Sequence, residues 1–186
     1  IMAKNRYAAS VSWTDGAHHE NEMYVKGIEM KQGRLPNALK SALHSTINGI
    51  LERKNEFEIT EDLEDLVRRI VSADIGVQDL CIKAKLNKNL SEYTVLSEAR
   101  AGAQWANTHL GKGYRKDDYF LTTLDADGNY IAFDEANEIE GIAQIGYRHI
   151  AERFVFNKVQ PYYEVMGWDI VRLENALNGM SDMQWL

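Results

Sequence analysis

Cysteine is almost absent from this 186-residue sequence, which contains Cys81 alone. A single thiol excludes an intramolecular disulfide and any zinc site that needs several cysteines, so we expect a reducing intracellular setting, cytoplasmic or nucleoid-associated. The sequence also lacks any apolar run near the roughly 20 residues that cross a bilayer. Its amino terminus has no apolar signal-peptide core. We therefore expect no membrane partner.

Positive charge is scarce and unevenly placed. The net charge is −7, which argues against indiscriminate nucleic-acid binding through a uniformly basic surface. Residues 1–54 carry eight Lys/Arg against five Asp/Glu, whereas the rest of the chain carries thirteen against twenty-three. Contacts with phosphate are therefore expected in the first third and in local clusters beyond it.

Hydrophobic patterning predicts an α+β fold, without an internal repeat, a low-complexity stretch or a linker. Alternation predicts strands at 6–13, 23–30, 79–86, 119–124 and 130–133. Helical spacing predicts helices over 36–54, from a cap at Thr60 to Val71, and over 95–109, 147–166 and 168–178. The first two strands form a hairpin with a long polar tip. Because two strands alone are marginal in water, this hairpin is expected to complete a sheet whose other strands lie elsewhere.

Four segments carry the most specific motifs of the chain. They are Lys4-Asn5-Arg6-Tyr7, residues 25–30 (VKGIEM), residues 79–93 (DLCIKAKLNKNLSEY) and residues 153–167 (RFVFNKVQPYYEVMG). The first resembles the K-K-R-Y motif of family B DNA polymerases, and the second resembles the K-G-I-E strand that follows it. The last two are similar to segments of that family's thumb. Asn5 and Ala84 stand where the family has lysine, which suggests a divergent, viral member.

The resemblance implies a division of the chain and a role for each part. Residues 1–33 would be the C-terminal hairpin of the palm, and residues 34–186 a mainly helical thumb with a small strand-rich insert. The family's catalytic aspartates with their Mg²⁺ ions, its triphosphate-binding helix and its proofreading exonuclease all lie upstream of the first motif. We therefore expect no catalytic or metal-binding residue and no cofactor in this chain, which would be inactive alone.

The implied function is that of one part of a DNA-directed DNA polymerase, a nucleotidyltransferase of DNA replication. This chain would hold the primer–template duplex during synthesis. The partner would be a separate palm/exonuclease portion, either because the polymerase is naturally split or because the chain is a fragment of one.

The candidate DNA contacts fall into two groups. Lys4, Asn5 and Arg6 would donate to minor-groove acceptors that every base pair presents, and Tyr7 would support the primer strand. A local cluster in the acidic region could neutralise phosphates: Lys83, Lys85, Lys88, Lys112, Arg115 and Lys116. Lys83 and Lys85 share one strand face, so a merely solvated face is an equal alternative for them.

The sequence ends with Met183-Gln184-Trp185-Leu186. Family B polymerases often end in a short apolar peptide that docks on a sliding clamp. These four residues are therefore candidate clamp-binding residues, and the alternative is a frayed or packed chain end.

Other polar groups have simpler interpretations. Asp125-Ala126-Asp127-Gly128 offers metal ligands, but Asp-Gly between two apolar strands is a strong turn signal. His18-His19 is interpreted as a polar hairpin tip, and Trp13, Trp105 and Trp168 as packing residues.

Two alternatives to the polymerase thumb stay open. One is a stand-alone DNA-binding or regulatory protein that reuses the thumb fold without synthesis. The other, with little support, is a metal-dependent hydrolase that uses Asp125, Asp127 and the histidines.

Overall fold

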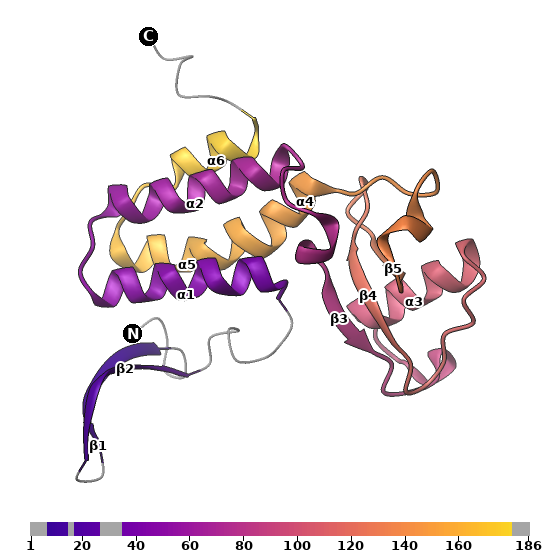
Figure 1. Ribbon diagram of the computed structural model, residues 1–186, viewed down its shortest axis with the longest axis horizontal. Helices are drawn as coiled ribbons and strands as arrows, with labels where there is room; N and C mark the ends of the chain where they lie inside the picture. Colours follow the sequence, from indigo (N-terminus) through magenta and orange to yellow (C-terminus); the bar gives the residue numbers. More distant parts are fainter. Residues whose placement is uncertain (1–6, 15–16, 27–34, 180–186) are drawn as a thin grey trace.

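The computed structural model describes residues 7–14, 17–26 and 35–179, which form an α+β fold (Figure 1). A two-stranded hairpin is followed by a pair of helices, a three-stranded antiparallel sheet with one helix against it, and closing helices that return to the first pair. The α+β class agrees with the prediction from the sequence. Within these ranges no helix combines the length and the apolar character that crossing a bilayer requires.

The hairpin consists of β1 (Tyr7–Thr14) and β2 (Ala17–Lys26). The strands pair antiparallel from Tyr7 opposite Lys26 to Thr14 opposite Ala17, with a shift of register between Val11 and Trp13 that passes over residues 19–21 of β2. The predicted long polar tip is therefore wrong, because residues 18–22 belong to β2. A strand pair that faces water tolerates polar residues as readily as apolar ones, so polarity does not mark a loop here.

Some predictions for the hairpin cannot be compared with the structure. Residues 27–30 of the second predicted strand and the side chain of Trp13 lie outside the described part of the chain. Ala8 is partly buried and packs against the helical core, so β1 lies beside α1 (Asn37–Leu51).

The two helices after the hairpin are α1 and α2 (Glu56–Val71). Pro36 precedes the first turn of α1, in agreement with the predicted start. The predicted cap of α2 at Thr60 is wrong. Asn55 caps the helix instead: its side chain accepts from the Glu58 N–H at 2.9 Å, while the Glu58 carboxylate accepts from the Asn55 N–H at 3.2 Å.

Thr60 lies one turn inside α2 and serves the packing of the helical layer. Its buried hydroxyl lies 2.7 Å from the Tyr163 hydroxyl. A buried hydroxyl needs such a partner. Asn55 therefore caps α2, whereas Thr60 makes a tertiary contact with Tyr163.

The closing helices form one long run and one short helix. The run consists of α4 (Tyr147–Ala151), a π-helical turn (Glu152–Phe156) and α5 (Asn157–Met166), as the predicted helix over 147–166 requires. The short helix, α6 (Val171–Leu177), packs against α2. The helical core contains Leu39, Leu43, Ile47, Leu63, Val67, Ile70, Ile150, Phe154, Tyr163 and Leu173.

A buried charge fixes α6 against α2. The side chain of Glu64 is only 6% exposed, and both Arg68 and Arg172 bind its carboxylate. A buried carboxylate is costly unless cations and hydrogen bonds surround it, so the two guanidinium groups offset the burial of Glu64 and join α6 to α2.

The sheet has the strand order β3-β4-β5. The strands are β3 (Ile82–Lys85), β4 (Tyr119–Leu124) and β5 (Tyr130–Phe133). The predictions for 119–124 and 130–133 are confirmed. The strand predicted over 79–86 is shorter, because Val77–Leu80 forms a 3₁₀ turn. Further 3₁₀ turns are Leu90–Glu92 and Ala136–Ile139.

The helix α3 (Glu98–His109) covers one face of this sheet. It begins three residues later than predicted, because the Ser97 side chain accepts from the Arg100 N–H at 3.3 Å and caps it. Gly102 allows the close approach. A Cβ there would lie 2.9 Å from the Thr122 hydroxyl and 3.1 Å from the Ala132 Cβ.

The turn predicted at Asp125-Ala126-Asp127-Gly128 is confirmed. The Asp125 carboxylate accepts from the N–H groups of Asp127 and Asn129 at 3.0 and 2.8 Å. Gly128 has φ +79°, which glycine adopts without strain. Trp105 and Trp168 are partly buried against the cores, in agreement with their predicted packing role.

The contact at Gly102 gives a prediction. Gly→Ala in a helix normally stabilises, but Gly102→Ala should lower the free energy of unfolding by about 1–3 kcal/mol, because the added methyl group overpacks the interface between α3 and the sheet. Thermal or denaturant unfolding measures the change. The control is Gly76→Ala, since a Cβ at Gly76 meets only a carboxylate oxygen at 4.0 Å. Equal stability of the two variants would contradict the described packing.

Candidate nucleic-acid interface

The two faces of the sheet are covered differently. On one face α3 packs against β4 and β5. On the other face Ile139, from the segment after β5, packs against Ile131 and Phe133. The β3–β4 end of this second face carries no apolar cover among the described residues: Tyr119 is 68% exposed and Lys83 is exposed.

The register of β3 and β4 places the polar side chains of that end together. Lys85 pairs with Tyr119, and Lys83 pairs with Leu121. Directly opposed residues of an antiparallel pair point to the same face, as do residues two apart along a strand. Both lysines and the tyrosine therefore lie on one face of the sheet.

Two loops join this face at the same end. The Leu86 N–H donates to the Asp118 carbonyl at 3.1 Å, and the Asp117 N–H donates to the Leu86 carbonyl at 2.7 Å. The turn after β3 and the turn before β4 therefore lie side by side. The structure thus brings together five of the predicted DNA-binding residues, which we name the basic loop end: Lys83, Lys85, Lys88, Arg115 and Lys116.

One member of the basic loop end has an anionic neighbour. The Lys85 ammonium lies 2.8 Å from the Asp117 carboxylate and 5.2 Å from the centre of the Tyr119 ring. The hydrogen bond and charge of Lys85, with a smaller contribution from Lys116, hold the pKa of Asp117 below its usual range. The same hydrogen bond raises the pKa of Lys85. Within the described ranges no carboxylate forms an ion pair with the other four cations.

Lys112 does not belong to this group. Its ammonium binds the Asp134 carboxylate at 2.7 Å and the Glu138 carboxylate at 2.6 Å. Tyr114 also donates to Asp134, at 2.7 Å. Since two carboxylates neutralise Lys112, it ties the loop before β4 to the segment after β5, and we leave it out of the interface.

The remaining predicted site residues are not placed. Lys4, Asn5 and Arg6 lie outside the described residues, as do Met183, Gln184, Trp185 and Leu186. The backbone of Tyr7 opens β1 opposite Lys26, but its side chain is not described.

Sequence reasoning misses two residues of this site. These residues are Asp117, which belongs to no predicted element, and Tyr119, which is predicted only as the start of a strand. The alternation of β4 offers a signal for Tyr119, because Phe120 beside it is buried and a period of two places Tyr119 on the opposite face. No local signal pairs Asp117 with Lys85.

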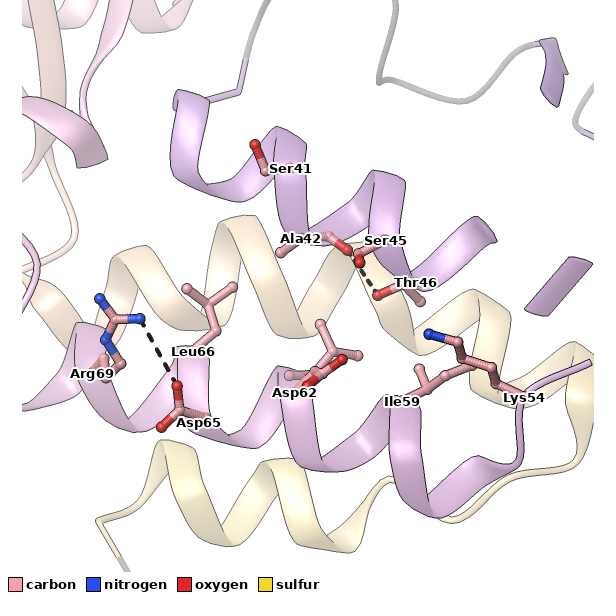
Figure 2. Close-up of a pocket in the computed structure, with 11 residues that line it drawn as sticks. Ser41, Ala42, Ser45, Thr46, Lys54, Ile59, Asp62, Asp65, Leu66 and Arg69 are labelled. Atoms are coloured by element: carbon pink, nitrogen blue, oxygen red, sulfur yellow. Dashed lines mark hydrogen bonds and ion pairs between the residues drawn. The ribbon is translucent and has the colours of Figure 1, made fainter. Parts of the chain in front are cut away.

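Two hollows elsewhere are weaker candidates. A groove of about 280 Å³ lies between α1 and α2 (Figure 2), and its lining includes Ser41, Ser45 and Asp62. Its Asp65 and Arg69 pair with each other at 3.9 Å, so its charges largely cancel. A hollow of about 410 Å³ lies beside the π-helical turn, lined by Leu124, Gly128, His149, Glu152, Arg153, Asn157 and Lys158.

Two further observations concern the single thiol and the possible metal ligands. Burial, with Asp79 contributing, raises the pKa of the Cys81 thiol to about 12, so this thiol stays protonated and unreactive. In the described part of the chain, no three or more His, Cys, Asp or Glu side chains gather as a metal-binding group.

Comparisons with known proteins give no family. No protein-family model matches the chain, and no curated protein sequence matches it.

The ion pair gives a prediction for the pKa of Asp117. Replacing Lys85 by Met should raise this pKa toward that of an ordinary aspartate, because the hydrogen bond and the positive charge that stabilise the carboxylate are removed. Carboxyl carbon shifts followed by NMR from about pH 2 to pH 6 measure it, with Lys83→Met as the matched control. An unchanged Asp117 pKa in Lys85→Met would contradict the pair.

Proposed function

We propose that this chain is the thumb part of a family B DNA polymerase and holds primer–template duplex during synthesis. Residues 1–33 would complete the palm and residues 34–186 would form the thumb. A separate palm/exonuclease portion would supply the catalytic carboxylates and bind the Mg²⁺ ions. The sequence resemblance supports the family, and the basic loop end supports the DNA-binding role.

The convergence of five cations on one open end of the sheet carries the DNA-binding part of the proposal. The chain as a whole is acidic, with a net charge of −7, so chance alone does not favour such a group. The cations come from two chain segments that backbone hydrogen bonds hold together. Lys and Arg side chains arranged in this way suit the phosphates of a duplex backbone and require no particular base sequence.

The hairpin supports the need for a partner portion. Among the described residues β1 pairs only with β2, so the outer edge of each strand has no strand beside it. Isolated hairpins are marginal in water, and open edges accept further strands. In Figure 1 the hairpin and the loop end of the sheet extend to the same side of the helical layer. One duplex lying along that side could reach both.

Reconstitution tests the proposed function. We expect primer extension only when this chain is mixed with the corresponding palm/exonuclease portion, because each part lacks groups that the other supplies. Primer extension is measured for each part alone and for the mixture. Duplex binding without association or rescue would contradict the polymerase role and favour a stand-alone DNA-binding protein. Metal-dependent hydrolysis by the isolated chain would favour the hydrolase.

The basic loop end gives a second prediction, on salt dependence. A variant with Lys83, Lys88 and Arg115 all replaced by Gln should bind duplex DNA more weakly, because fewer phosphates are neutralised. Its log–log slope against salt should be shallower by about 0.9 for each phosphate that the variant no longer neutralises.

The matched control replaces three cations outside the cluster, Lys54, Arg69 and Arg148, by Gln. Fluorescence anisotropy with the full chain, from about 50 to 300 mM salt, measures both variants. The same slope in the two variants would show that the basic loop end is not the interface.

A further inference from the structure

The turn that contains Asp117 is stabilised by hydrogen bonds that do not involve the Asp117 side chain. The Asp117 N–H donates to the Leu86 carbonyl at 2.7 Å, and the Asp118 N–H donates to the Arg115 carbonyl at 3.1 Å. The Asp118 carboxylate in turn accepts from the Arg115 N–H at 2.9 Å. The backbone and Asp118 thus fix the turn, so the Asp117 carboxylate is left for another role.

The backbone of Asp117 is also unusual. Its φ is +73°, in the left-handed region that few residues other than glycine, asparagine and aspartate adopt readily. This conformation coincides with a carboxylate placed beside Lys85, in the middle of a group of cations.

The geometry around Lys85 describes a site for one anionic oxygen. The Lys85 ammonium donates to the Asp117 carboxylate at 2.8 Å, and the ring of the exposed Tyr119 lies beside it, with its centre 5.2 Å away. The Asp117 side chain is 62% exposed, so it can turn away into water. A phosphate oxygen has the same charge and hydrogen-bonding character as the carboxylate oxygen that it would replace.

We propose that Asp117 is an internal competitor for the duplex phosphate that Lys85 binds. This inference rests on the proposed DNA-binding function. In the free chain the carboxylate occupies Lys85, and on binding a backbone phosphate takes its place. The ring of Tyr119 keeps the ammonium in position throughout the exchange.

The solvent exposure of the Lys85–Asp117 pair limits how much Asp117 lowers the affinity for duplex DNA. Solvent weakens ion pairs between exposed side chains, so the carboxylate reduces duplex affinity without blocking it. A thumb that held every phosphate at full strength would also release DNA slowly at each step of synthesis. Asp117 thus supports repeated release of the duplex.

The test compares Asp117→Asn with Asp118→Asn in the full chain. Asn tolerates the left-handed backbone, and both changes remove one negative charge from the same turn. Binding of a duplex oligonucleotide is measured by anisotropy against salt. We expect Asp117→Asn to bind about two- to fivefold more tightly at about 0.1 M salt, with a gain that shrinks as added salt screens the pair, and Asp118→Asn to change the affinity much less.

A second background separates competition from a general change of charge. In Lys85→Met, Asp117→Asn should give no more gain than Asp118→Asn, because the cation for which they compete is absent. An equal gain in both backgrounds would overturn the proposal. So would unchanged affinity in Asp117→Asn, provided that thermal unfolding shows an intact fold. Asp117→Gly, which also suits the left-handed backbone, replaces it if Asp117→Asn does not fold.

These outcomes differ from failure of the proposed function. If the unaltered chain shows no salt-dependent duplex binding, both the proposed DNA-binding function and the competitor role of Asp117 are wrong. If it binds duplex and loses affinity in the variant with Lys83, Lys88 and Arg115 replaced, while Asp117→Asn changes nothing, only the role of Asp117 is wrong.

Discussion

The position of the sheet relative to the helices depends on a contact between two backbones. Where β4 ends, the Gly146 N–H donates to the Leu124 carbonyl and the Ala126 N–H donates to the Gln144 carbonyl, each at 2.9 Å. A Cβ on Gly146 would lie 1.9 Å from the Asp125 carbonyl oxygen, so only glycine fits. The next helix begins at once, because the Ile150 N–H donates back to the Gly146 carbonyl.

This contact links the candidate interface to the helical layer. The strand β4 carries Tyr119 at one end and meets Gly146 at the other. The helical run that starts after Gly146 then passes through the π-helical turn into the core around Tyr163. The basic loop end and the helical core are therefore joined through one strand and the helical run that follows Gly146.

Local sequence patterns predict the helices and strands of this chain better than the tertiary contacts that these elements make. Apolar spacing predicts the helices, and the Asp-Gly turn predicts β4 and β5 at their observed bounds. The cap of α2 is misplaced because two capping signals lie close together, and the choice depends on Tyr163, which is 103 residues away from Thr60. Polar residues 18–22 give no sign of a strand in the sequence, whereas in the fold His18 and Glu22 pair with Trp13 and Val11 of β1.

In the candidate site, too, local sequence identifies the residues but not their tertiary contacts. Lysines and arginines close together in an acidic region mark it, so its cations can be named from the sequence. Which of them keep their charge available depends on carboxylates brought in by the fold. Lys112 meets Asp134 and Glu138, which are 22 and 26 residues away. Lys85 meets Asp117 only because β3 and β4 pair in one register, and no spacing along the chain reveals that.

Among the described residues the outer edges of β1 and β2 have no strand beside them, which has a consequence for the behaviour of the chain at high concentration. An edge strand without a neighbour offers its backbone N–H and C=O groups to any strand that arrives, including β1 or β2 of another copy. The polar sequence of β2 reduces such self-association but does not remove these backbone groups. At high concentration, copies of this chain are therefore expected to associate edge to edge through their hairpins.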